Sequence, residues 1–365
     1  MNHEKYKLLK EYTITKNIEN IKLTINNNNN DNNITFYLNI HKNVCIPYWL
    51  TSERLEFLNK IIQLDKKDII ICTYPKSGTT FLEQIVLLLE NGIKKKDYVN
   101  PVNRNSYQME NKFGKIWIES LIHFKKEEYC KYNADYIPEG EYIDYDYFVN
   151  EIGSPRIIKT HASLDLLLDK ESSDRNKIII ISRNPLDTCV SHYYHFAPII
   201  EKKFNIKLTF DIWALLWLEG LVPFGCWFEW TKTWYKKYQE NFIANSTANS
   251  SANIMWIYYE DLVSNPESKI REISNFLEKE KEIKEDELLE IVKESSFKNM
   301  SEQMLKADDF SNKFNHLRKG IIGDWRNHFD DAMHKKFVDK FLCEMKGLDL
   351  KYFLGNDEYL TCPNI

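Results

Sequence analysis

The segment Thr73-Tyr-Pro-Lys-Ser-Gly-Thr-Thr-Phe81 decides the fold, because it joins an apolar run over residues 68–74 to a helical pattern over residues 80–90. The start of a helix offers unpaired N–H groups and a partial positive charge, so it attracts phosphate. Gly78 lets the backbone approach a ligand closely, and Lys76 adds a full charge. A capped turn explains the glycine and one threonine but not the whole sequence. We therefore predict an anion-binding loop.

This loop differs from the Walker A motif, GxxxxGK[ST], in which the lysine follows the last glycine. Here Lys76 precedes Gly78, and Pro75 stands where that motif has a glycine before its lysine. The lysine is therefore expected to project from the strand side of the loop. Three hydroxyl donors complete the loop, on Ser77, Thr79 and Thr80. A kinase that transfers phosphate remains a rival class, weakened by the order of these residues.

Three further runs read as buried strands, at residues 156–160, 177–182 and 254–259. Helical patterns follow near residues 186–194 and 261–277. Apolar strands that alternate with helices indicate a parallel sheet covered on both faces. Such sheets bind ligands at the carboxyl ends of their strands. The sequence thus predicts an α/β fold, a single domain with a central parallel sheet flanked by helices and a P-loop-like phosphate-binding loop.

Seven consecutive residues, Tyr74-Pro-Lys-Ser-Gly-Thr-Thr80, resemble the 5′-phosphosulfate loop of the cytosolic sulfotransferases. Further motifs of that family follow in the family's order over about residues 68–329. The resemblance implies a transferase that moves a sulfuryl group from 3′-phosphoadenosine 5′-phosphosulfate (PAPS) to a hydroxyl or amine of a small acceptor. It also implies that Phe81, where the family usually has tryptophan, stacks on adenine.

The segment Lys159-Thr-His161 is similar to the family's Lys-Thr-His motif and closes the second predicted strand. A lone histidine at a strand end is usually structural, but one beside an anion loop suits general-base catalysis. The resemblance assigns His161 as the base. Lys76 and Lys159 would stabilise charge on the transferring group and the leaving oxygen, and Ser191 would restrain Lys76 until the acceptor binds.

The segment from Ser182 to Ser191 resembles the family's 3′-phosphate-binding segment, which implies that Arg183 and Ser191 hold that phosphate. Arginine suits this role because its planar fork can grip phosphate with two hydrogen bonds. A salt bridge from Arg183 to Asp187 is the alternative, and the arginine could serve both roles. We interpret two histidines of the following helix, His192 and His195, as packing or surface groups.

The octet Arg318-Lys-Gly-Ile-Ile-Gly-Asp-Trp325 is similar to a second phosphate-binding signature of the family. It implies that Arg318, Lys319 and Gly320 bind the 3′-phosphate, whereas a basic surface turn is the alternative. The residues from 300 to 317 are expected to form a cap over the nucleotide that excludes water.

Two shorter matches imply adenine contacts. The sequence Tyr259-Glu-Asp261 is similar to a Tyr-Glu-Asp element whose tyrosine reaches adenine. The sequence Ser295-Ser-Phe297 resembles a Thr-Ser-Phe element, with Ser295 in place of threonine, and implies nucleotide contacts for Ser295 and Phe297.

Composition limits the function classes. The 365 residues are 43% hydrophobic, enough for a sizeable core. With 49 Lys and Arg against 54 Asp and Glu, the chain lacks the basic excess of nucleic-acid-binding proteins. Residues 208–228 are the most apolar stretch but contain Asp211 and Glu219, so no membrane span is expected. Seven scattered cysteines and an N-terminus without an apolar core predict a cytoplasmic protein. No residues have metal-ligand spacing, so no metal is expected.

We divide the chain into an N-terminal extension (residues 1–50) with an Asn-rich tract at 26–33, a catalytic domain (51–350) and a C-terminal tail (351–365). The family's dimer motif is degraded and reads Arg326, Asp330, Asp331 and Lys335 at the aligned positions, which predicts a monomer or weak homodimer. Aromatic residues in segments 98–124, 136–148 and 196–210 suggest a phenol or sterol-like acceptor. A catalytically silent nucleotide-binding protein is the other rival, weakened by the presence of both His161 and Lys76.

Overall fold

The computed structural model describes residues 12–16, 20–25, 34–52, 55–56, 64–92, 106–108, 111–122, 143–144, 155–163, 176–248, 252–278, 283–306, 317–354 and 359–361.

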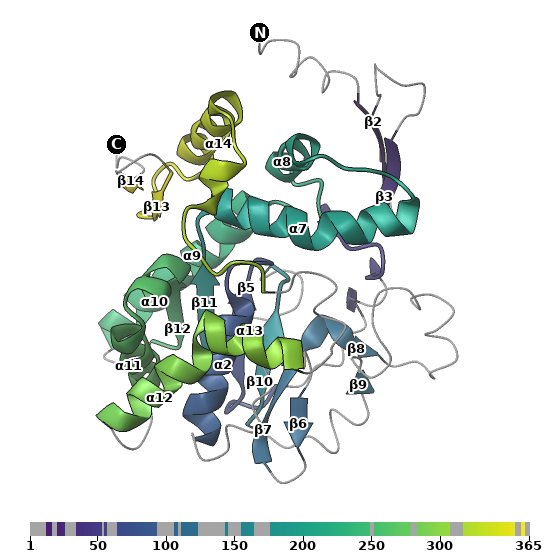
Figure 1. Cartoon of the computed structure of the whole chain (residues 1–365). Coiled ribbons are helices and arrows are strands. Elements are labelled where there is room, and N and C mark those ends of the chain that lie inside the picture. The colour runs from purple at the N-terminus through teal and green to yellow at the C-terminus, as the bar shows by residue number, and fades with distance from the viewer. Residues whose placement is uncertain are drawn as a thin grey trace.

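A six-stranded sheet forms the centre of the molecule, in the order β12-β11-β5-β10-β7-β6 (Figure 1). Five of its strands are parallel, and β6 pairs antiparallel with β7. The strands are β5 (Ile69–Thr73), β6 (Ser106–Gln108), β7 (Asn111–Trp117), β10 (Ile157–Thr160), β11 (Lys177–Ser182) and β12 (Ile254–Tyr258). The predicted parallel sheet is confirmed, with all four predicted strands adjacent. Sequence analysis missed β7 because its NKFGKIW sequence lacks a continuous apolar run.

The central strands are apolar throughout because each sheet face is covered by its own core. In β5, Ile70 and Cys72 belong to one buried cluster, while Ile69 and Ile71 belong to another. Successive side chains of a strand point to opposite faces, so the two clusters lie on opposite sides of the sheet. Burial on both faces is the reason that this strand reads as a continuous run.

Helices cover both faces of the sheet (Figure 1). The cluster that contains Ile69 includes side chains of α2 (Thr79–Asn91), α10 (Tyr259–Ser264), α11 (Pro266–Phe276) and α12 (Glu285–Ser295). The opposite cluster includes side chains of α7 (Pro185–Phe204), α8 (Phe210–Leu218), α9 (Trp227–Ala248) and α14 (Asp331–Glu344). The helix α13 (Phe297–Lys306) follows α12.

The prediction of one helix over residues 261–277 was wrong, because the structure has two helices, α10 and α11, that meet at Asn265. Asn265 has a φ of −135° and a ψ of 59°, outside the helical region. It precedes Pro266, whose ring disfavours the helical conformation of the residue before it. Pro266 itself is the first residue of α11, a position that proline tolerates well.

The N-terminal segment forms a second, four-stranded antiparallel sheet, which was not predicted. Its strands are β1 (Tyr12–Lys16), β2 (Asn20–Ile25), β3 (Ile34–His41) and β4 (Val44–Ile46). The buried side chains of Leu23, Phe36 and Leu38 belong to the same core cluster as α7, so this sheet is packed onto the α/β body. The Asn-rich tract, residues 26–33, lies outside the described residues.

The predicted C-terminal tail contains β13 (Lys351–Phe353) and β14 (Tyr359–Thr361), which pair antiparallel. Tyr352 is buried, and its hydroxyl lies 2.5 Å from the Ser182 hydroxyl at the end of β11. The beginning of the tail is therefore anchored against the central sheet.

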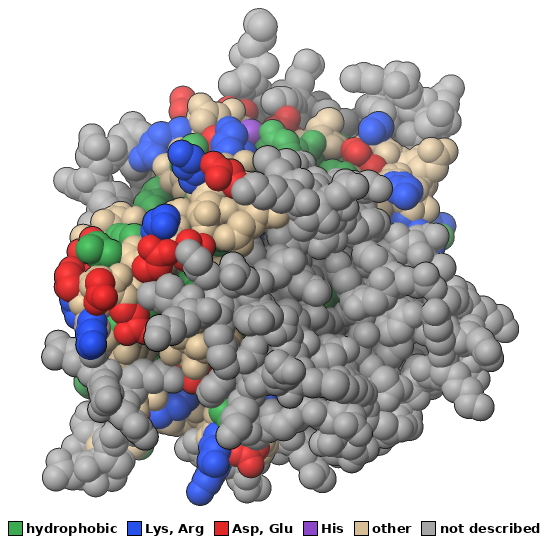
Figure 2. Space-filling model, turned by 60° about the horizontal axis from the view of Figure 1, so that its bottom comes forward, with side chains coloured by type: hydrophobic (Ala, Val, Ile, Leu, Met, Phe, Trp, Pro, Cys, Tyr) green, Lys and Arg blue, Asp and Glu red, His purple; other side chains and the backbone are tan. Residues whose placement is uncertain are grey.

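The surface carries both signs of charge. Figure 2 shows acidic and basic side chains interspersed over the described part of one face. Within the described residues, no helix has the length and apolar character needed to cross a bilayer. The described cysteines, at 45, 72, 189, 226 and 343, are not in disulfides.

Candidate active site

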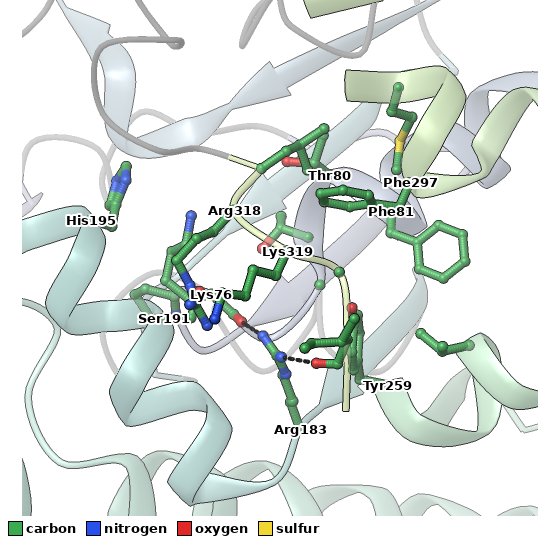
Figure 3. A pocket seen from close by; sticks show the side chains of 18 of the residues that line it. Lys76, Thr80, Phe81, Arg183, Ser191, His195, Tyr259, Phe297, Arg318 and Lys319 are labelled. Atoms are coloured by element: carbon green, nitrogen blue, oxygen red, sulfur yellow. Dashed lines mark hydrogen bonds between the residues drawn. The ribbon is translucent and has the colours of Figure 1, made fainter. Parts of the chain in front are cut away.

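A cavity with a volume of about 290 Å³ lies at the carboxyl ends of the parallel strands. Its wall brings together most of the predicted site residues, which come from six separate parts of the sequence. They are Lys76, Gly78, Thr79, Thr80, Phe81, Lys159, His161, Arg183, Ser191, Tyr259, Phe297, Arg318, Lys319 and Gly320. In Figure 3, Lys76, Ser191 and Arg318 gather on one side, while Phe81 and Phe297 lie on the other. The cavity therefore has a cationic end and an aromatic end.

Three residues lie differently from what the sequence suggested. Ser77 is fully buried and does not line the cavity. The Ser295 hydroxyl donates to the Ile291 carbonyl at 2.7 Å within its own helix, and Ser296 forms the wall instead. His195 packs edge-on against Phe196, as its interpretation as a packing group implies, but it also lines the cavity.

The neighbouring His192, by contrast, packs as expected. It is completely buried, and its Nε2 lies 3.1 Å from the Pro223 carbonyl. Burial lowers the pKa of His192 to about 3, so this ring is neutral near pH 7.

The anion loop between β5 and α2 has an unusual backbone. Lys76 and Gly78 have positive φ values of 71° and 109°. Gly78 occupies the N-cap position and leaves the first turn of α2 without a side-chain cap. Thr79 and Thr80 at the start of this helix line the cavity, where the N–H groups and the positive end of the helix dipole favour an anion.

Gly78→Ala is expected to weaken binding of 3′-phosphoadenosine 5′-phosphate (PAP) at least about tenfold. A Cβ at this position would lie 2.6 Å from Cδ2 of Tyr259, another cavity residue, and φ is positive. Gly92→Ala is the matched control, because Gly92 has a φ of 73° but nothing within 4 Å of the added carbon. It should lose about 1 kcal/mol of stability from backbone strain without a change in PAP affinity. Calorimetric titration and thermal unfolding measure both effects, and equal PAP affinities in the two variants would contradict the expectation.

The His161 ring is held in one orientation. Its Nδ1 lies 2.9 Å from the Thr73 carbonyl oxygen and 3.0 Å from the Thr73 hydroxyl. Because a carbonyl oxygen only accepts hydrogen bonds, Nδ1 carries the proton, and Nε2 of the neutral ring carries the lone pair that can accept a proton. The rings of Trp117 and Phe224 pack edge-on to the imidazole, with centroids at 5.9 and 5.3 Å.

Glu119, which sequence analysis missed, fixes the backbone around this histidine. It lies in the short helix η3 (Ile118–Ser120) after β7 and is fully buried. Its Oε1 accepts hydrogen bonds from the Thr160 hydroxyl and from the His161 and Ala162 N–H groups, at 2.9, 2.7 and 3.0 Å. Burial raises the pKa of Glu119, and these three hydrogen bonds partly offset the rise. The sequence feature that could have pointed to Glu119 was a single carboxylate at the end of the apolar run Ile116-Trp-Ile-Glu119.

Lys159 reaches the cavity wall from β10 while being only 5% exposed. Its Nζ lies 3.2 and 3.3 Å from the two carboxylate oxygens of Glu83, a buried residue of α2. Glu83 was also missed, because the helical pattern alone did not show which neighbour it would contact.

Arg183 links the anion loop to the octet that ends at Trp325, at the cationic end of the cavity. Its guanidinium donates to the carbonyls of Lys76 and Ile321 at 3.2 and 3.1 Å, as Figure 3 shows. It also lies 4.4 Å from the centre of the Tyr259 ring. Asp187 instead accepts hydrogen bonds from the Gly323 and Trp325 N–H groups, at 2.6 and 3.0 Å. The alternative of an Arg183–Asp187 salt bridge is therefore not what the structure has.

The octet that ends at Trp325 is organised around Asp324. Arg318 Nη1 and Lys319 Nζ lie 2.6 and 2.7 Å from its carboxylate oxygens. Burial raises the pKa of Asp324, but hydrogen bonds from Lys319, Asn327 and Arg318 outweigh it and hold the pKa well below its usual range. Asp324 therefore stays ionised and keeps both cations at the cavity wall, where the Lys319 side chain is 47% exposed and that of Arg318 is 13% exposed.

Aromatic side chains form the opposite end of the cavity. The Phe81 and Tyr259 rings meet edge-on with centroids 6.5 Å apart. Phe297 packs against Gly320, where any Cβ would clash with the ring at 2.3 Å. The expected cap is described only as far as α13, and residues 307–316 lie outside the described residues. Of the predicted acceptor segments, 98–124 is described at residues 106–108 and 111–122, and 136–148 only at residues 143–144. Trp117 of the first segment and Phe196 of the third line the cavity.

The sulfotransferase domain family matches this sequence over residues 66–349. The chain belongs to the sulfotransferase family. Mouse sulfotransferase 1B1 is 31% identical over 295 residues, which cover 78% of this chain and 85% of the relative. Bovine sulfotransferase 1E1 is 29% identical over 293 residues, with coverages of 78% and 85%. The prediction of a PAPS-dependent sulfotransferase is confirmed at the level of the family.

Solved sulfotransferase structures share the fold. Mouse sulfotransferase 7A1, solved in complex with PAP, has a TM-score of 0.60 at 22% identity and covers 86% of this chain and 96% of its own. Retinol dehydratase, solved with androsterone and PAP, has a TM-score of 0.61 at 19% identity, with both chains covered to 96%. These similarities confirm the single α/β architecture expected of this sulfotransferase.

The sulfotransferase cavity has the donors that an anionic nucleotide requires. The buried Nε groups of Arg183 and Arg318 have no hydrogen-bond partner among the described residues. Guanidinium groups with an unused donor match phosphate oxygens well. In the described part of the chain, no group of three or more His, Cys, Asp or Glu residues is arranged to hold a metal ion.

Proposed function

We propose that this sulfotransferase moves the sulfuryl group of PAPS to a hydroxyl or amine of a small apolar acceptor, with His161 as the general base. The observation that carries the proposal is the hydrogen bond from His161 Nδ1 to the Thr73 carbonyl. It leaves Nε2 as the proton-accepting atom in a cavity that also contains the anion loop.

The reaction is an in-line displacement at sulfur. The acceptor oxygen or nitrogen forms a bond to sulfur while the bond from sulfur to the 5′-phosphate oxygen breaks, and PAP leaves. The acceptor proton passes to His161 Nε2, a step worth about 10²–10⁴-fold in rate. Lys76 and Lys159 stabilise the charge on the transferring group and on the leaving oxygen, which makes a metal ion unnecessary for this role. Ser191 restrains Lys76 before the acceptor binds.

The nucleotide spans the cavity from the cationic to the aromatic end. The 5′-phosphosulfate binds at the anion loop, which contributes Lys76, Ser77, Gly78, Thr79 and Thr80. The 3′-phosphate binds Arg183, Ser191, Arg318, Lys319 and Gly320. Adenine lies among Phe81, Tyr259 and Phe297, where ring faces and edges suit stacking. Ser295 is the weakest member of the set, because its hydroxyl is bonded within α12.

An apolar acceptor is supported by the side chains around His161. Trp117, Phe196 and Phe224 line the cavity beside His161, and the apolar side chains of Val44, Ile46 and Leu50 line a pocket of about 10 Å³ that shares His161 and Phe224 with it. Such walls favour a phenol or a sterol-like alcohol over a charged acceptor. Androsterone and retinol, the small molecules in the solved retinol dehydratase complexes, have this character.

We further propose a monomer or weak homodimer. The positions that align with the family's dimer motif make contacts within the chain. The Asp330 side chain caps α14 by accepting from the Met333 N–H at 2.8 Å, and Lys335 pairs with Asp339 at 3.0 Å. We also propose a cytoplasmic location and no nucleic-acid or membrane partner. The proposed domain boundaries stay at residues 50 and 350.

The test uses the purified full-length chain. Titration calorimetry with PAP should show binding, and labelled PAPS with a panel of phenols, sterols, aliphatic alcohols and amines should yield a sulfated product. ATP with Mg²⁺ should give no phosphorylated product. No heat with PAP would reject the proposed nucleotide site, binding without transfer to any acceptor would favour a silent nucleotide-binding protein, and ATP-dependent transfer would favour a kinase.

A further inference from the structure

The contact between Lys159 and Glu83 joins two elements that are far apart in the sequence. Lys159 lies on β10, which ends at Thr160 immediately before His161, while Glu83 lies in the second turn of α2, which follows the anion loop. The Lys159 ammonium lies 3.2 and 3.3 Å from the two Glu83 oxygens. This pair therefore connects the helix of the anion loop to the strand that carries the proposed base.

Both partners of this pair are shielded from water. The side chain of Lys159 is 6% exposed and that of Glu83 is 1% exposed. A buried ammonium without a counter-charge tends to lose its proton, because the low-dielectric surroundings disfavour the charged form. A buried carboxylate left without its partner is similarly costly. Each charge therefore depends on the other.

The surroundings of Lys159 are uncharged within the sheet and titratable in the cavity wall. Its neighbours in the sheet are Trp117 on β7 and Ile71 on β5, both uncharged, and its Nζ lies 5.9 Å from the centre of the Trp117 ring. The titratable side chains that share the cavity wall with Lys159 are Lys76, His161, Arg183, His195, Tyr259, Arg318 and Lys319, and Glu119 lies next to the His161 backbone. The Glu119 oxygen Oε1 is engaged by Thr160, His161 and Ala162.

We propose that Glu83 is a positioning residue for sulfuryl transfer, which keeps Lys159 charged and aimed into the cavity at the reacting group. The inference rests on the proposed function, because it assumes that Lys159 acts on the transferring group. An ammonium has three donors, so Lys159 can bind the carboxylate and still offer an N–H to an anionic oxygen.

The proposal predicts a change in pH dependence for Glu83→Gln. The amide keeps the shape of the side chain but removes its charge, so the Lys159 ammonium loses its counter-charge in a site that is shielded from water. The ratio of kcat/KM at pH 9 to that at pH 7 should fall at least about tenfold relative to the parent. The assay uses PAPS and the aliphatic alcohol with the highest turnover in the panel, so that acceptor ionisation does not contribute.

Two further variants separate charge from shape. Glu83→Asp keeps the charge and should retain the parent pH ratio even if kcat is lower. The double variant Glu83→Gln with Lys159→Arg should lose no activity at pH 9 beyond that of Lys159→Arg alone, because a guanidinium stays charged. Glu90→Gln, the same change further along α2, is the matched control and should leave the ratio unchanged.

The outcomes distinguish this inference from the proposed function. Absence of PAPS-dependent turnover in the parent enzyme would reject the proposed function itself. With an active parent, an unchanged pH ratio in Glu83→Gln would overturn the role of Glu83. An equal loss in Glu83→Gln and Glu83→Asp would also overturn it, since a packing role would respond to shape and not to charge.

Discussion

His161→Ala should lower kcat at least about 100-fold while PAP affinity stays within about threefold of the parent. The imidazole is the proposed proton acceptor, and its Nδ1 is fixed on the Thr73 carbonyl at 2.9 Å. The anion loop and the 3′-phosphate residues lie on other elements, so loss of this ring should not remove a nucleotide contact. Single-turnover rates with labelled PAPS and calorimetry with PAP measure the two quantities.

Chemical rescue provides the control for His161→Ala. Truncation leaves space between Trp117 and Phe224, whose rings pack edge-on to the native imidazole. Added imidazole should restore part of the lost turnover in the variant and leave the parent rate unchanged. Near-normal turnover in His161→Ala would reject the assignment of the base. A parallel loss of PAP affinity would instead show that the ring has a structural role.

The second large effect is expected for Arg318→Ala, which should weaken PAP binding about 10- to 150-fold. A hydrogen bond to a charged group contributes about 1.5–3 kcal/mol, and Arg318 is proposed to hold the 3′-phosphate. Its removal also leaves the buried Asp324 with one cation fewer, and that carboxylate would then repel the phosphate.

Comparison of two nucleotides makes this test specific. AMP lacks the 3′-phosphate, so its weaker affinity should change little between the parent and Arg318→Ala. The affinity for PAP, by contrast, should fall by the full factor of about 10 to 150. Arg326→Ala is the matched control, because Arg326 lies in the same segment but stacks on Trp325 at 4.6 Å and is not part of the cavity wall. Equal losses for AMP and PAP in Arg318→Ala would contradict the 3′-phosphate assignment.

Sequence patterns predicted the elements that form the cavity floor but not those that support them. The four central strands were recognisable because burial on both faces makes them continuously apolar. The strand β7 lacks a continuous apolar run, so it was missed, and Glu119, two residues after it, was missed with it. The N-terminal sheet was also not predicted, because an Asn-rich tract separates β2 from β3 and interrupts the pattern.

Motifs located the ligand-facing residues more reliably than they described their partners. The local sequence around Lys159 and Arg318 marks them as cations near an anion site. Their counter-ions Glu83 and Asp324 depend on distances that only the folded chain reveals. The choice between Ser295 and Ser296 depends on the rotation of one helix, which a match of three residues does not specify.

The hydrogen bonds from Gly323 and Trp325 to Asp187 have a consequence for biosynthesis. Because ribosomes make the chain from its N-terminus, Asp187 emerges long before the segment that it fastens. The proposed 3′-phosphate pocket is complete only after Trp325 has been made. Cellular nucleotide can therefore stabilise finished molecules by mass action, while prematurely terminated fragments gain no such protection and stay exposed to proteolysis.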